Sequence, residues 1–293
     1  PTTWPTYGLF SDRPWSEFNL AEAHLYFSVI GLTFLLTTEI AFSLWFFFVL
    51  YKLSYVWLAY LGSGATGFWA DWGLAIPTHE TAGAMAVIAG FLCWSARRSL
   101  KEWWDRALAG TSSDGRDPIP PRWALGLIVL GIAGMVLWFL AAGAAWWVAL
   151  LGVLVFLMVI LVLTRIVAES GLMFVQTNVV AYDVIAGLFP PAWLGGASLN
   201  ALMMQKAILM NDLREIFMPY VMNGLKAADA ARLRLGQVLA VFAVTAVIAL
   251  GISAYGRIGT YYKYGGVNMD QWANVWSPHS FLDGLRDRIK QTE

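Results

Sequence analysis

Long stretches without any charged side chain predict several membrane-spanning helices in this sequence. The run Trp123–Thr164 holds 42 residues with no Asp, Glu, Lys, Arg or His. Because a helix rises 1.5 Å per residue, this run is too long for one crossing of an apolar layer about 30 Å thick and long enough for two. We therefore expect spans at 123–141 and 145–166, joined by a turn of small residues. A second uncharged run, Leu235–Gly256, predicts another span at 233–255.

Two further predicted spans are less regular. The segment 80–98 is apolar and ends at a pair of arginines. The segment 23–52 is apolar except for His24 near its start and Glu39 at its middle. We interpret 23–52 as one long tilted helix. Two half-helices that meet at 37–39 are the alternative.

The pattern changes in the irregular segment 168–229. Residues 179–189 are apolar apart from two side chains, and a pair of prolines follows them. This stretch is too short for a full span, so we expect a re-entrant or interfacial segment. Apolar residues then recur at helical spacing over 199–220. They predict an amphipathic helix, kinked near Pro219.

The distribution of Lys and Arg predicts an orientation in the membrane. Six basic residues lie in 97–122, and three lie just before the last span. The loop 61–79 has none. Because short cytoplasmic loops carry an excess of basic residues, we expect both basic regions and the N-terminus in the cytoplasm. The predicted transmembrane domain covers 1–256, and 257–293 is an aromatic extramembrane tail on the opposite side.

Composition agrees with this pattern and excludes several classes of protein. Hydrophobic residues make up 59% of the chain, and charged residues make up 13%, about half of the 25% typical of soluble domains. An ordinary soluble enzyme and a disordered chain are therefore excluded. The 19 basic and 19 acidic residues cancel, which gives no reason to expect a nucleic-acid partner. The predicted fold is an all-α polytopic transmembrane bundle of about five spans, with the lipid bilayer as its first partner.

No motif for catalysis or for cofactor binding is present in the sequence. There is no phosphate-binding loop and no nucleophile elbow. His79-Glu80 is followed by Thr-Ala-Gly, so it is not a zinc-protease motif. The three histidines lie outside the middle of the predicted spans, where haem or chlorophyll ligands are expected. We therefore predict a protein that is not an enzyme and has no cofactor or metal.

Charged residues within the spans are the sharper functional signal, because placing them in the bilayer costs about 2.5–3.5 kcal/mol each. Arg165 and Glu169 are four residues apart at the end of a predicted span, so they can pair on one helix face. The pair is either a structural brace or part of a polar cavity. In the cavity interpretation, the substrate or proton pathway comprises Glu39, Arg165, Glu169, Gln176, Asn178 and Asp183. We interpret Asn211, Asp212 and the charged residues after them as a solvated face rather than a third contributor.

Four short elements carry a resemblance to a known family. They are Phe42-Ser43-Leu44-Trp45-Phe46-Phe47-Phe48, Ala96-Arg97-Arg98, Thr164-Arg165 to Gly171, and Asp212-Leu213-Arg214-Glu215 with Met218-Pro219. In this order they resemble an uncharacterised family of large bacterial polytopic proteins, a domain of unknown function. That family is in turn distantly similar to the oligopeptide transporter superfamily. Its members are longer, which implies that this chain is a C-terminal portion preceded by further spans. The resemblance also implies a bacterial inner (cytoplasmic) membrane location.

Two functional hypotheses follow from these features. The first is a transporter-like membrane protein, a secondary transporter of unknown substrate for which proton coupling is an analogy at the level of fold. The second is a non-catalytic structural or accessory subunit of a larger respiratory or photosynthetic membrane complex. Its motivation is the 16 tryptophans and the aromatic tail. The expected partners are the missing N-terminal spans or other membrane subunits.

Overall fold

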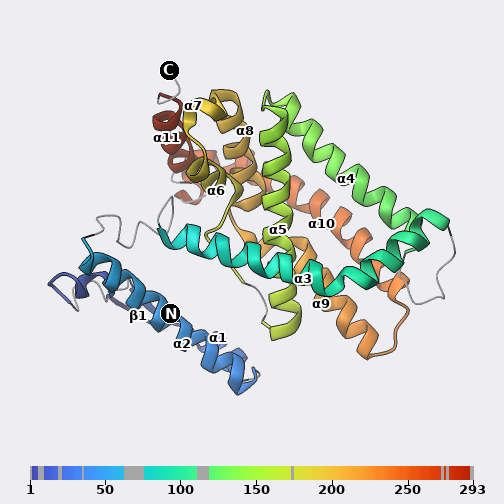
Figure 1. The fold of residues 1–293 in the computed structure, drawn as a ribbon, viewed down its shortest axis with the longest axis horizontal. Coiled ribbons are helices and arrows are strands. Elements are labelled where there is room, and N and C mark those ends of the chain that lie inside the picture. Colours follow the sequence, from blue (N-terminus) through green and yellow to red (C-terminus); the bar gives the residue numbers. More distant parts are fainter. Residues whose placement is uncertain are drawn as a thin grey trace.

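The computed structural model describes residues 2–5, 10–18, 22–34, 36–62, 76–110, 119–172, 175–271, 274 and 277–290. These residues are mostly helical (Figure 1), so the prediction of an all-α bundle is confirmed. The short strands are β1 (Thr2–Pro5) and β2 (Glu22–Leu25), which pair in an antiparallel manner. A 3-10 turn, η1 (Trp15–Phe18), lies between them in the sequence and packs against α2.

Four helices of the described residues are long and apolar enough to cross a membrane. They are α2 (Thr38–Tyr60), α4 (Pro121–Ala141), α5 (Trp146–Ser170) and α10 (Leu235–Tyr264). Helix α3 (Ile76–Ala109) contains the expected span 80–98 but does not reach the apolar character of the other four. Helix α3 also continues to Ala109, through the first part of the basic region 97–122, which we expected to connect two spans. Part of the loop 61–79, namely 63–75, and residues 111–118 lie outside the described residues.

The first predicted span is not one long helix. Helix α1 (Phe27–Thr33) ends before α2 begins at Thr38, and Thr37 is extended, with φ −65° and ψ 147°. The Thr33 hydroxyl donates to the carbonyl of Ile30 at 2.8 Å, which helps to end the first helix. Glu39 therefore lies in the first turn of α2 and not at mid-span. Its negative charge is favourable in the first turn, because the helix N-terminus carries a partial positive charge. The alternative of a break near 37–39 is the closer description, but the predicted span 23–52 was wrong at its start, because residues 22–25 form β2 and the first helix begins only at Phe27.

The amphipathic helix expected over 199–220 is also broken. The chain forms α6 (Ala181–Leu188), α7 (Pro191–Leu194), α8 (Gly196–Gln205), a π-helical turn η3 (Lys206–Met210), a 3-10 turn η4 (Leu213–Glu215) and α9 (Phe217–Ala230). The interruption lies at 206–216, before Pro219. That proline is in the first turn of α9, where no backbone N–H bond is lost, so it causes no kink.

Helix α5 is the centre of the packed structure. It contacts α3, α4, α6, α8 and α9, and in Figure 1 it runs through the middle of the helices. Gly152 allows α4 and α8 to approach α5 closely, because a Cβ there would lie 2.9 Å from the Phe139 ring of α4 and 3.2 Å from Leu202 of α8. The Gly152 carbonyl also accepts a hydrogen bond of 3.2 Å from the buried Gln205 amide.

Helix α10 differs from α5 because none of its described residues is buried. It packs on α9, where the Phe217 and Phe242 rings meet edge to face with centroids 6.3 Å apart. The apolar surface of α10 is what a helix in contact with lipid presents.

The close packing at Gly152 predicts a contrast between two glycines. In an open helical position, Gly→Ala stabilises by up to about 1 kcal/mol. A Cβ added at Gly134 of α4 would meet no atom within 4 Å, so Gly134→Ala should raise the thermal midpoint of the purified protein. Gly152→Ala should lower the midpoint, because overpacking costs about 1–3 kcal/mol. Equal shifts for both variants would contradict the contact of α4 and α8 with Gly152.

Candidate binding cavity at the broken helix

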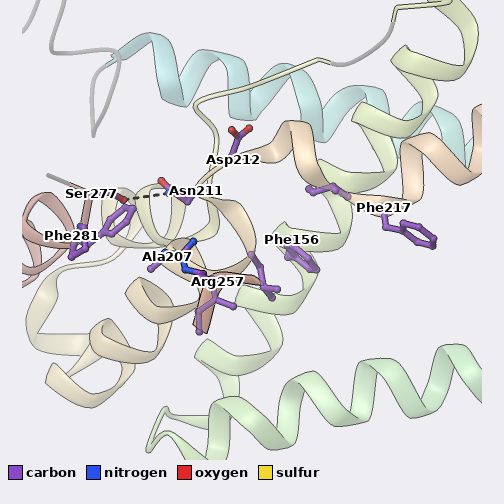
Figure 2. Close-up of a pocket in the computed structure, with 12 residues that line it drawn as sticks. Phe156, Ala207, Asn211, Asp212, Phe217, Arg257, Ser277 and Phe281 are labelled. Carbon is purple, nitrogen blue, oxygen red and sulfur yellow. Dashed lines mark hydrogen bonds between the residues drawn. The ribbon is translucent and has the colours of Figure 1, made fainter. Parts of the chain in front are cut away.

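A cavity of about 740 Å³ lies where the helix after α8 is interrupted. Its walls come from α5, the π-helical turn η3, the residues up to α9, the helix α10, and α11 (Ser277–Ile289). Figure 2 shows Ala207, Asn211 and Arg257 gathered in this region, with Phe156 to one side. This volume is within the range of small-molecule sites in proteins, about 300–1,000 Å³.

The irregular backbone of η3 and η4 positions the polar groups of the cavity. A π-helical turn adds a residue to the helix and often occurs at functional sites. Met210, the last residue of this turn, is buried, and its Sδ accepts from the backbone N–H of Ala181 at 3.5 Å. The next residues leave the helix, with Asp212 at φ −128° and ψ 96°. Asn211 and Asp212 therefore line the cavity instead of continuing a helical face.

The charge of Asp212 is balanced locally. Its carboxylate accepts from the Arg214 Nε–H at 2.8 Å, from a terminal guanidinium nitrogen at 2.5 Å, and from the Arg214 backbone N–H at 3.0 Å. The hydrogen bonds from the Arg214 side chain lower the pKa of Asp212 below its usual 3.8, while partial burial opposes this shift. Arg214 is therefore the counter-ion of Asp212.

Arg257 supplies the other charge of the cavity lining. Its guanidinium donates to the Tyr261 hydroxyl at 3.0 Å and lies 5.3 Å from the centroid of that ring. Within the part of the chain that the structure describes, no carboxylate forms an ion pair with Arg257. Asn211 donates to the Ser277 hydroxyl at 3.4 Å across the cavity wall (Figure 2). The site thus combines one cation without an ion pair with two neutral hydrogen-bonding side chains.

The charged residues predicted at the spans lie outside this cavity. Arg165 and Glu169 form an ion pair on α5, and both side chains are exposed, by 54% and 58%. Glu39 is exposed at the start of α2. None of the three lines either of the two cavities described here.

Gln176 and Asn178 line a second, smaller cavity of about 190 Å³. Its other polar lining includes Tyr51 of α2 and Thr78 at the start of α3. The polar stretch after α5 therefore lines a small cavity together with residues of α2 and α3, which are distant in sequence.

Asp183 occupies a third place, inside the protein. Asp183 is only 4% exposed, and its carboxylate accepts two hydrogen bonds from Lys206 Nζ, at 3.0 and 3.1 Å. Lys206 is the first residue of η3 and also lies over the Tyr182 ring, 5.5 Å from its centroid. This pair joins α6 to the π-helical turn, so the six predicted residues do not form one continuous pathway.

Sequence reasoning missed Arg257 and assigned Asn211 and Asp212 to a solvated face. One signal was available for Arg257, because it follows directly after the uncharged run that ends at Gly256. No sequence pattern pairs Asp183 with Lys206, which is 23 residues away.

The Asp183–Lys206 pair is much less exposed than the Arg165–Glu169 pair. Breaking it should therefore lower the free energy of unfolding much more. Lys206→Met removes the ammonium that donates two hydrogen bonds to the buried Asp183 carboxylate, and breaking a buried pair by removing one partner costs about 3–5 kcal/mol. Lys206→Met should therefore lower the free energy of unfolding by about that amount. Glu169→Gln, which breaks the exposed pair, should cost at most about 1 kcal/mol. Thermal unfolding of the purified variants measures both, and equal losses would contradict the assigned burial.

Comparison with known proteins places the chain in a family but supplies no activity. No curated protein and no solved structure matches it. A family model covers the whole chain, residues 1–293, and its description is a family of unknown function. The four apolar helices add that this family member is a membrane protein. The chain belongs to DUF6785, a family of unknown function.

Proposed function

We propose that this protein is a transporter-like membrane protein and that the cavity at the broken helix binds its solute. One observation carries this proposal: the cavity lies beside Phe156, near the middle of the apolar helix α5. The cavity lining also includes Arg257, Ser277 and Phe281, so in this proposal part of the segment 257–293, expected outside the membrane, packs against the spans. Irregular backbone at membrane depth is tolerated where protein or a water-filled cavity covers it. Secondary transporters bind substrates near the bilayer midplane at such interrupted helices.

The residues of the cavity have distinct roles in this proposal. Arg257 attracts and orients a solute, while Asn211 and Ser277 supply neutral hydrogen-bonding groups. The π-helical turn and the 3-10 turn on either side of Asn211 hold its side chain at the cavity wall, so the solute meets a preformed polar group. No covalent chemistry is assigned to these residues.

The orientation proposed for the protein rests on where basic residues gather. Lys226 Nζ donates to the Ala168 carbonyl at 2.5 Å, so the C-terminal part of α9 lies beside the end of α5. Arg122, at the start of α4, is at the same end, because α4 and α5 are joined by a short turn and pack on each other. That turn itself carries no charge. The basic end therefore faces the cytoplasm in this proposal.

Cysteine labelling in membrane vesicles tests the orientation. Ala231→Cys, between α9 and α10, should react with an impermeant maleimide from the cytoplasmic side. Ala141→Cys, next to the turn between α4 and α5, should react from the opposite side. Both variants carry Cys93→Ala, because Cys93 is exposed and would react. Labelling of both positions from one side would contradict the arrangement of α4 and α5 as two crossings.

Access to the cavity tests the proposed function. Ala207→Cys, in the same Cys93→Ala background, should react with a small hydrophilic methanethiosulfonate in native membranes. Pools of metabolites should include one that slows this reaction, and that solute should then be taken up by vesicles that contain the purified protein.

The accessory-subunit hypothesis predicts a different pattern at Ala207→Cys. If another subunit fills the cavity, the cysteine is unreactive in native membranes and becomes reactive only after the complex is dissolved in detergent. Under that result the transporter proposal is wrong.

A further inference from the structure

The unbalanced charge of the cavity identifies a substrate class, an inference that rests on the proposed function. Among the described residues of the lining, two carry a formal charge, Asp212 and Arg257. Arg214 already neutralises Asp212 through hydrogen bonds to both carboxylate oxygens. Arg257 has no ion-pair partner among the described residues. Among the described residues, the cavity lining therefore presents one net positive charge, on the exposed side chain of Arg257, and an anionic solute compensates it.

A hydrogen-bonded chain holds the Arg257 guanidinium in place. One of its terminal nitrogens donates to the Tyr261 hydroxyl. That hydroxyl in turn donates to the Asn274 side-chain oxygen, and the Asn274 amide nitrogen donates to the Asp270 carbonyl at 2.8 Å. A guanidinium has five N–H donors in a fixed plane, so Arg257 retains donors for two parallel hydrogen bonds. A planar carboxylate fits this geometry.

The rest of the lining is mostly apolar. Aromatic residues of three helices line the cavity, namely Phe156 on α5, Phe217 on α9 and Phe281 on α11. In Figure 2 the Phe217 ring points away from Arg257, and it packs on Phe242. Aliphatic side chains of η3 add to the apolar lining. A hydrated inorganic anion would leave these walls without contacts, whereas an apolar body would bury its surface against them.

We infer that the cavity binds a monocarboxylate with an apolar body, held by its carboxylate at Arg257 and by its apolar part against Phe156 and Phe281. Asn211 and Ser277 then accommodate a neutral polar substituent of the solute. The cavity selects this class of solute in two ways. Arg257 favours a negative charge, and the aromatic rings in the same lining favour an apolar body.

Protection of Ala207→Cys from the methanethiosulfonate measures this specificity. Ala207 and Arg257 line the same cavity (Figure 2), so we expect a solute held at Arg257 to shield the cysteine. The probes are phenylacetate, its neutral amide phenylacetamide, the cation phenethylamine, and inorganic phosphate. Phenylacetate should slow labelling at a concentration at least about tenfold lower than the other three, because only it combines both features.

Variants of Arg257 separate its charge from a general effect on the fold. Arg257→Gln should raise the phenylacetate concentration needed for protection by about tenfold or more, whereas Arg257→Lys keeps the charge and should retain the preference over the amide. Lys263→Gln is the matched control. It removes a positive charge from the same helix outside the cavity lining and should change nothing.

Several results would overturn the inference. They are equal protection by the amide, the amine or phosphate, protection that persists in Arg257→Gln, and no protection by any of the four probes. The cysteine of Ala207→Cys could also be protected without added solute in phosphatidylglycerol vesicles but not in phosphatidylcholine vesicles. That result would assign the cavity to a lipid headgroup and would also overturn the inference. If a different solute still protects Ala207→Cys and is taken up, the proposed function stands and only the substrate class is wrong.

Discussion

The ion pair between the buried Asp183 and the partly buried Lys206 is the interaction on which the cavity depends. A carboxylate and an ammonium removed from water are tolerated inside a protein only if they meet each other with good geometry. Here they meet at 3.0 Å and thereby fix α6 against the first residue of the π-helical turn. Because the turn is held at this end, the chain beyond it leaves the helix at a defined place, where Asn211 and Asp212 reach the cavity.

The second constraint is the close contact around Gly152. The lack of a side chain at this position lets α8 approach α5 until a buried amide can bond the α5 backbone. This contact and the ion pair lie on consecutive residues, Gln205 and Lys206. Together they anchor the end of α8 to two different neighbours, so the interruption that follows is a rigidly supported part of the fold instead of a loose connection.

Sequence reasoning predicted the apolar helices well and the site only in part. The spans 123–141 and 145–166 nearly coincide with α4 and α5, because uncharged runs report directly on the bilayer. The break at 206–216 was missed, since Leu209, Leu213 and Phe217 keep a helical period across it. Contacts with α6 and α11, which no local pattern encodes, override that period. Glu39 was misplaced because the short break before α2 leaves the apolar run around it unchanged.

The lack of buried residues on α10 has a consequence for motion. This helix carries Arg257, the cationic wall of the cavity, yet its packing within the described residues is mainly with α9. Few interior contacts resist a tilt of α10 through the surrounding lipid, whereas the opposite wall on α5 is held by five neighbouring helices. One wall of the cavity is therefore fixed and the other is free to tilt, so the width of the cavity is coupled to the thickness and lateral pressure of the membrane.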